Sequence, residues 1–218
     1  MYFYSRQQAG SLLARRMIYQ YRYENCAVVT LNDGGVMVGA QIAQALHCII
    51  NVLLTGEITL PREPEAVGGI TNEGSFIYNS AYSREEISDL ETEFRGYIEQ
   101  QKYSQMSSMN RFLSGSGLID RDRLKGRNII LTADGLKTPF LLELAMEFFK
   151  PILIERLIVA VPVISTEVVD WLHVHADDIY VLTVTPNFID TDHYYDKQDI
   201  PSKKAIKKTI ANIVLNWK

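Results

Sequence analysis

The sequence predicts an α/β protein built on a doubly wound, mostly parallel sheet. Five short apolar runs, centred near residues 28, 50, 129, 158 and 181, have the composition of buried strands. Apolar residues at helical spacing occupy most of the intervals between these runs. Alternation of this kind is typical of parallel sheets that helices cover on both faces. We therefore expect a single domain over residues 1–218.

The composition is that of an ordinary globular protein. A chain of 218 residues with 47% hydrophobic and 22% charged residues can bury a core of its own, which excludes wholesale disorder. The net charge of −4 argues against a dedicated nucleic-acid binder. No apolar run reaches the roughly 18 to 20 residues of a membrane span, and the amino terminus lacks an apolar signal core. We expect a cytoplasmic protein without a membrane partner.

The first elements follow from capping and turn residues. Ser5 is a suitable N-cap for a helix whose apolar residues recur through Met17. Residues 27–31 form a strand that ends at the polar, glycine-rich stretch 32–35, and a helix over 36–46 and a strand over 49–54 follow. Cys26 and Cys48 each adjoin an apolar run, which predicts two buried, reduced thiols.

The middle of the chain is predicted to hold an insertion of a helix and a flexible loop over residues 82–117. Residues 60–75 are rich in proline, glycine and glutamate, which predicts a loop before it. Ser83 and Glu86 form a capping box at the start of the helix. The serine-rich residues 104–117 have the composition of a linker, either a mobile flap or a plain connector.

The stretch 128–142 predicts a strand, a tight loop and a helix, with Asp134 and Gly135 in the loop. In open α/β sheets, ligands bind in the crevice beyond the carboxyl ends of the strands. Such a loop can present an acid to sugar hydroxyls and backbone N–H groups to a phosphate. Beyond it we expect strands at 156–163 and 178–184, a helix at 166–173, an irregular hood at 186–199 and a final helix at 202–217 with a basic face.

Several local patterns, in this order and spacing, resemble the type I phosphoribosyltransferase family, especially its little-characterised bacterial branch. They span nearly the whole chain from Phe3 to about Asp199. The matching pieces are Phe3, Arg6, Ala9, Gly10, Leu13 and Ala14 of the first helix, residues 31–43 (LNDGGVMVGAQIA), 61–70, 127–138 and 159–163, the run Ala176-Asp177-Asp178, Pro186 and Phe188.

The resemblance implies displacement of pyrophosphate from phosphoribosyl pyrophosphate (PRPP) by a nitrogenous base, with Mg²⁺. The PRPP motif of the family has two adjacent acids and a loop of small residues around the 5′-phosphate. This chain has Ala133 in place of one acid, and Pro139 and Phe140 in place of small residues, so that the ring of Phe140 is expected to crowd the phosphate. Asp33 stands where the pyrophosphate loop of the branch is basic, and residues 54–57 replace an arginine-lysine pair.

These departures favour a phosphoribosyltransferase-like protein that is non-catalytic and binds a small phosphorylated, nucleotide-like or anionic ligand, or a protein partner. The alternative is an active transferase with an atypical site, which would require Mg²⁺. Residues 83–101 leave a homodimer open as well. Asp134 is the candidate catalytic residue, and no metal site is expected. The candidate ligand-binding residues are Asp33, Gly34, Gly35, Asp134, Gly135, Lys137, Thr138 and Phe188.

Two further clusters have more than one interpretation. His173, His175, Asp177 and Asp178 lack the spacing of a zinc site and fit a polar helix end. The segment after the last strand could stack on a planar ligand or form a packed aromatic corner beside surface acids. Its residues are Asp190, Asp192, His193, Tyr194 and Tyr195.

Overall fold

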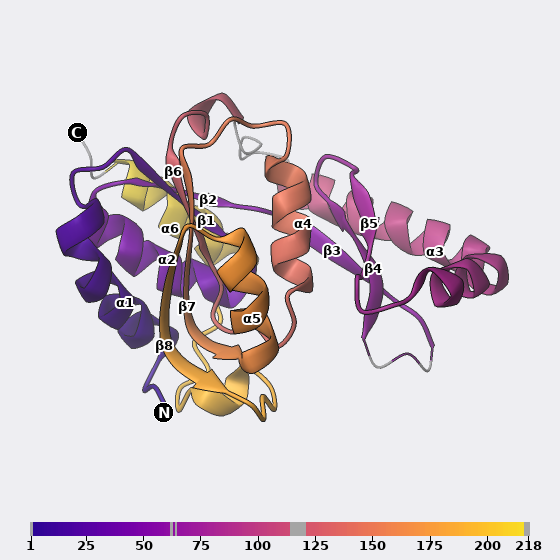
Figure 1. Ribbon diagram of the computed structural model, residues 1–218. Helices are drawn as coiled ribbons and strands as arrows, with labels where there is room; N and C mark the ends of the chain where they lie inside the picture. The colour runs from indigo at the N-terminus through magenta and orange to yellow at the C-terminus, as the bar shows by residue number, and fades with distance from the viewer. Residues whose placement is uncertain (1, 62, 64, 114–120, 216–218) are drawn as a thin grey trace. The chain divides into compact units, whose positions relative to one another are not determined.

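The computed structural model describes residues 2–61, 63, 65–113 and 121–215 (Figure 1). Within the single domain that the sequence predicts, the chain forms two compact units. The first comprises Met1–Val52, Ile119–Pro139 and Ile152–Lys218, and the second comprises Leu53–Leu118 and Phe140–Pro151. No helix in the described ranges is long and apolar enough to span a membrane.

The first unit contains the predicted parallel sheet. Its strand order is β2-β1-β6-β7-β8, and every neighbouring pair is parallel. The strands are β1 (Cys26–Thr30), β2 (Ile49–Val52), β6 (Asn128–Thr132), β7 (Arg156–Ser165) and β8 (Asp178–Thr185). Helices α1 (Arg6–Tyr21), α2 (Asp33–Leu46) and α6 (Lys203–Leu215) lie on one face, and α5 (Thr166–His175) lies on the other (Figure 1). The doubly wound α/β class predicted from the sequence is confirmed.

The starts of α1 and α2 are fixed by side-chain caps. The Ser5 hydroxyl accepts a hydrogen bond from the backbone N–H of Gln8 at 3.1 Å, as the sequence predicted. Asn32 caps α2 in the same way, because its Oδ1 accepts from the N–H of Gly35 at 2.8 Å. Helix α2 therefore begins at Asp33, three residues before the predicted start, and the expected loop 33–35 is its first turn.

The second unit contains an antiparallel sheet that the sequence did not predict. Strands β3 (Thr55–Thr59), β4 (Ala66–Thr71) and β5 (Phe76–Tyr78) pair in the order β3-β4-β5. The expectation of a loop over residues 60–75 was wrong for β4. Its glycines allow neighbouring side chains to approach the strand closely. A Cβ on Gly69 would lie 2.6 Å from a methyl carbon of Leu144 in helix α4 (Phe140–Phe149). A Cβ on Gly68 would lie 2.6 Å from the Phe76 ring.

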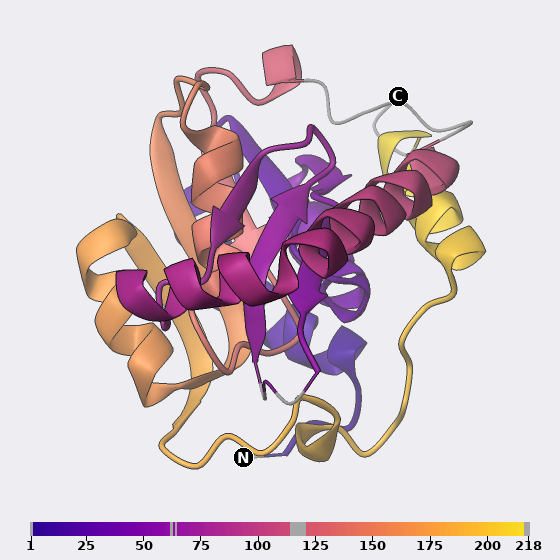
Figure 2. The ribbon, with the colours of Figure 1, turned by 90° about the vertical axis from the view of Figure 1, so that its right-hand side faces the viewer.

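Helix α3 (Arg84–Leu113) crosses this sheet (Figure 2) and begins with the predicted capping box. Ser83 N donates to the Glu86 carboxylate at 2.7 Å, and Glu86 N donates to the Ser83 hydroxyl at 3.3 Å. The helix continues through residues 104–113, where a linker was predicted; residues 114–117 lie outside the described ranges. Tertiary contacts outweigh the serine-rich composition, because Met109 is buried and the Gln105 amide donates to the carbonyl oxygen of Glu57 in β3 at 3.1 Å.

The cluster around His173 and His175 belongs to the end of α5 and the turn into β8. The His175 ring stacks on Trp171 with centroids 3.9 Å apart, and the Asp177 carboxylate accepts from the N–H of Leu157 at 2.7 Å. Asp178 accepts from the Tyr21 hydroxyl. Among the residues that the structure describes, no three metal-ligating side chains gather at one point. These polar groups hold the turn in place.

The two thiols are expected to be unreactive in the folded protein. Cys26 and Cys48 are free and buried, and burial raises the pKa of Cys26 to about 11 and of Cys48 to about 12. Since the thiolate is the nucleophile, a disulfide reagent at pH 8 should label neither residue in the native state and both in urea. Rapid labelling of one thiol without denaturant would contradict this burial.

Candidate functional site

The candidate site is the loop of residues 133–139 that follows β6, the central strand of the parallel sheet. Leu136 fixes this loop to β7: its N–H donates to the carbonyl oxygen of Val163 at 3.1 Å, and Ser165 N donates to the Leu136 carbonyl oxygen at 3.0 Å. The loop is thus an extension of the sheet at the carboxyl end of β6. Ala133, Asp134 and Gly135 within it are buried.

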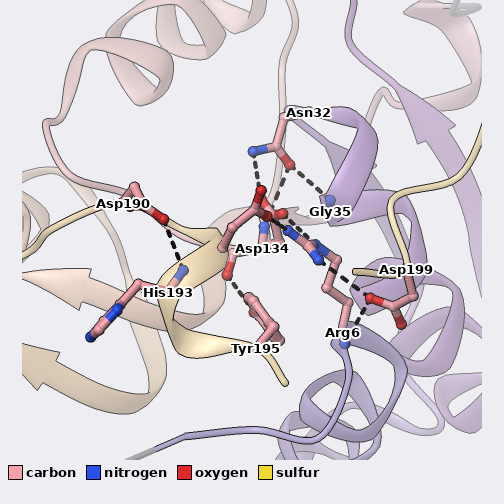
Figure 3. A network of polar contacts seen from close by, with 9 residues as sticks. Arg6, Asn32, Gly35, Asp134, Asp190, His193, Tyr195 and Asp199 are labelled. Carbon is pink, nitrogen blue, oxygen red and sulfur yellow. Dashed lines mark hydrogen bonds and ion pairs between the residues drawn. The ribbon is translucent and has the colours of Figure 1, made fainter. Parts of the chain in front are cut away.

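Asp134 has a protein partner on each of its oxygens (Figure 3). Its Oδ2 accepts from Arg6 Nε at 2.6 Å, and its Oδ1 accepts from Asn32 Nδ2 at 2.7 Å. The Tyr195 hydroxyl donates to its carbonyl oxygen at 2.5 Å. Burial raises the pKa of Tyr195, which keeps that hydroxyl protonated as a donor. With only 4% of its surface exposed, Asp134 is the centre of a buried polar network.

Arg6, the first residue of α1, is the cation of this network and is fully buried. Beyond Asp134, its NH2 group donates to the carboxylate of Asp192, and its NH1 group donates to Asp199 at 3.3 Å. The guanidinium also lies over the Tyr195 ring, 4.5 Å from the centroid. Burial alone would lower the pKa of Arg6, but the three carboxylates outweigh it and the pKa is raised. Arg6 is therefore a permanent positive charge.

The two glycines at the start of α2 allow this helix to pack directly against the loop. A Cβ on Gly34 would lie 1.9 Å from Oδ2 of Asp134 and 2.8 Å from Nε of Arg6. A Cβ on Gly35 would lie 2.9 Å from the Cα atom of Ala133. The structure thus brings both predicted glycines beside Asp134, in close contact with the loop.

Asp33 lies one residue earlier and forms an ion pair with Lys203 of α6, with 2.7 Å between Nζ and Oδ1. The sequence predicted that an acid here would repel an anionic ligand. The neighbouring ammonium offsets this charge, although both side chains are accessible to water and the pair is correspondingly weak.

The segment after β8 covers the other side of the loop. A Cβ on Gly135 would lie 2.9 Å from Thr191 and 3.3 Å from the ring of Phe188. Phe188 packs against Tyr194 with ring centroids 5.2 Å apart, and Tyr194 and Tyr195 are buried. The interpretation of this segment as a packed aromatic corner therefore agrees with the geometry, and Phe188 lies beside Gly135.

The remaining candidates lie at the end of the loop. Lys137 is exposed and Thr138 is half-buried. The expectation that Phe140 crowds a phosphate was wrong, because its ring lies in the apolar cluster of the second unit with Ala66 and Leu144. Phe140 is the first residue of α4, and its side chain follows the buried face of that helix.

Five residues of the network were absent from the predicted site residues: Arg6, Asn32, Asp192, Tyr195 and Asp199. One signal could have revealed Arg6. Arg6 precedes Ala9, Gly10 and Leu13 at helical spacing, so this side chain lies on the buried face of α1. A buried arginine needs an anionic partner. The partners themselves are 128 to 193 residues away in the sequence.

Comparison with known proteins finds curated relatives of similar sequence. No family model matches the chain. Over 188 residues, or 85% of its length, the chain is 26% identical to a protein named putative phosphoribosyl transferase in two strains of Mycobacterium tuberculosis, CDC 1551 / Oshkosh and H37Rv. The chain spans about two fifths of the length of these curated relatives, because the match covers 41% of them.

Among solved structures, TT1426 from Thermus thermophilus has the same fold, with a TM-score of 0.73 and 24% identity over 97% of this chain and 99% of that one. The names of these relatives agree with the resemblance seen in the sequence. The chain is therefore phosphoribosyltransferase-like, by its similarity in sequence to these curated relatives.

Proposed function

We propose that this protein has lost the PRPP chemistry of its relatives and binds a small nucleotide-like or anionic ligand, or a protein partner. The observation that carries the proposal is the state of Asp134. In the family reaction an acid at this position holds the ribose hydroxyls. Here its two carboxylate oxygens already accept from Arg6 and Asn32 at 2.6 and 2.7 Å, and the residue is buried. A ribose would have to displace a buried ion pair.

The backbone donors of the loop support the same conclusion. The N–H of Leu136 is bonded to β7, and the N–H of Asp134 is directed at Oδ1 of Asn32 at 3.4 Å. Pro139 has no N–H at all. Because each charge-assisted hydrogen bond to a phosphate contributes about 1.5–3 kcal/mol, the loss of several donors weakens phosphate binding strongly.

The residues of the loop do not fit Mg²⁺. This ion takes oxygen ligands and is usually held by one or two carboxylates together with the substrate phosphates. Ala133 supplies no side-chain oxygen, and the guanidinium of Arg6 lies 2.6 Å from Oδ2 of Asp134. Because both oxygens of Asp134 already accept from Arg6 and Asn32, a metal ion at this carboxylate would have to displace one of these partners.

Calorimetric titration of the full chain with PRPP and Mg²⁺ should give no saturable heat up to about 1 mM ligand, a concentration that corresponds to a binding free energy of roughly −4 kcal/mol. A coupled assay with a panel of nitrogenous bases should detect no release of pyrophosphate. An active phosphoribosyltransferase run on the same PRPP stock controls for substrate quality, and circular dichroism controls for folding.

The alternative function, transfer of phosphoribosyl to a nitrogenous base at an atypical site, has an opposite outcome in the same experiment. In that case the exposed Lys137 would supply a charge for the phosphate that the backbone no longer binds. Micromolar binding of PRPP, or pyrophosphate release with any base, would overturn our proposal in favour of this alternative.

A further inference from the structure

Residues 186–202, here called the strap, connect β8 to α6 and run past the loop of Asp134. The middle of the strap is fixed to the amino terminus. Phe3 N donates to the Tyr194 carbonyl oxygen and Asp196 N donates to the Phe3 carbonyl oxygen, both at 2.9 Å. Lys197 N donates to the Tyr4 carbonyl oxygen at 3.0 Å. Residues 194–197 thus pair with residues 3–4 and form an anchored segment.

The strap places one carboxylate on each side of this anchored segment, and both reach the same guanidinium. Asp192 accepts from NH2 of Arg6, and Asp199 accepts from NH1 at 3.3 Å (Figure 3 shows Asp199). Asp199 also accepts from the backbone N–H of Arg6 at 3.3 Å. With Asp134 on Nε, each nitrogen of the guanidinium donates to a different carboxylate. Two of these three carboxylates come from the strap.

The charges around Arg6, and the exposed fractions of the Asp192 and Asp199 side chains, indicate which kind of ligand could replace these two carboxylates. Three carboxylates surround one guanidinium, so a further anion can reach the guanidinium only in exchange for one of these carboxylates. The fork of N–H groups on arginine fits phosphate oxygens as well as carboxylates. The side chain of Asp192 is 51% exposed, whereas that of Asp199 is 11% exposed. An anion from solvent would therefore displace Asp192 from Arg6 before it displaced Asp199.

We propose that Asp192 and Asp199 are internal mimics of an oxyanion, which latch the strap onto Arg6 and keep phosphate-type ligands from its guanidinium. The site behind this latch takes an oxyanion of the pyrophosphate type, on the NH2 group of Arg6 that Asp192 releases. Binding requires Asp192 to swing into solvent, while the anchored residues 194–197 stay in place. This inference rests on the proposed function, since it describes how access to the same site is regulated.

The test measures the affinity of the full chain for inorganic pyrophosphate. It compares the wild type with the single variant Asp192→Asn and the double variant Asp192→Asn/Asp199→Asn. Removing the competing charge should raise the affinity for pyrophosphate about tenfold or more for the single variant, as expected when one charge-assisted contact is freed. The double variant should bind more tightly still. The matched control is Asp196→Asn, which removes one exposed charge from the anchored segment of the same strap and should change the affinity less than about twofold.

An equal gain in all three variants would mean unspecific electrostatics and would overturn the latch, as would no gain at all. A second measurement uses wild-type protein and therefore holds even if a variant fails to fold. The Nε–H resonance of the buried Arg6 in a ¹⁵N correlation spectrum should shift saturably with millimolar pyrophosphate. A constant resonance would count against the inference.

The two proposals fail separately. Turnover of PRPP by the wild type would overturn the proposed function and leave the pyrophosphate series intact. A pyrophosphate series without a gain would overturn the latch and leave the absence of turnover intact.

Discussion

Replacing Arg6 with alanine should lower the free energy of unfolding by about 3–5 kcal/mol, the usual cost of removing one partner from a buried ion pair. The cause is the burial of Asp134, whose carboxyl group, in a residue only 4% exposed, would lose its cationic partner. The same substitution removes the common partner of Asp192 and Asp199, so the strap would lose two of its attachments. Urea unfolding followed by circular dichroism measures the change.

The control for this prediction lies on the same helix. Arg15 in α1 is exposed, and its replacement by alanine should change the stability by no more than about 0.5 kcal/mol, as is usual for surface sites. Similar losses for the two variants would show that the Arg6 network contributes nothing special to the fold.

The second large effect is expected for Gly34→Ala. The added methyl group would lie 1.9 Å from Oδ2 and 2.4 Å from Cγ of Asp134, far inside contact distance. Either α2 or the loop must move, and overpacking of this kind costs about 1–3 kcal/mol or more. The free energy of unfolding, measured in urea, should fall accordingly.

Gly96→Ala provides a matched control of opposite sign. Gly96 lies inside helix α3, and a Cβ there would meet no atom within 4 Å. Alanine favours the helix and restricts the unfolded chain, so this variant should gain up to about 1 kcal/mol. Destabilisation by both variants to the same extent would mean that the contact with Asp134 is not the cause.

The parallel sheet could be predicted because its strands are continuous apolar runs whose signal is local. Residues 129–131 and 157–161, for example, are buried without exception. The antiparallel sheet of the second unit could not be predicted in this way. Gly68 and Gly69 suggest a loop in the sequence, yet they permit close packing with Phe76 and Leu144, and only the fold reveals those partners.

The sequence predicted the loop of the candidate site, residues 133–139, but not the polar network around Arg6. Asp134, Gly34 and Gly135 follow from strand ends and glycine positions, which are local features, and the structure brings Gly34 against Asp134. The partners of Arg6 depend on contacts that span 128 to 193 residues. No spacing rule connects such residues, so the sequence showed the acid and not the cation that neutralises it.

The path of the chain around Arg6 also constrains the order in which the protein can fold. This side chain leaves the ribosome long before two of its three carboxylates, which come from residues 192 and 199. Contacts of such long sequence separation form late and slow folding. During synthesis α1 therefore carries a guanidinium whose ion pairs cannot be completed until residue 199 has been made.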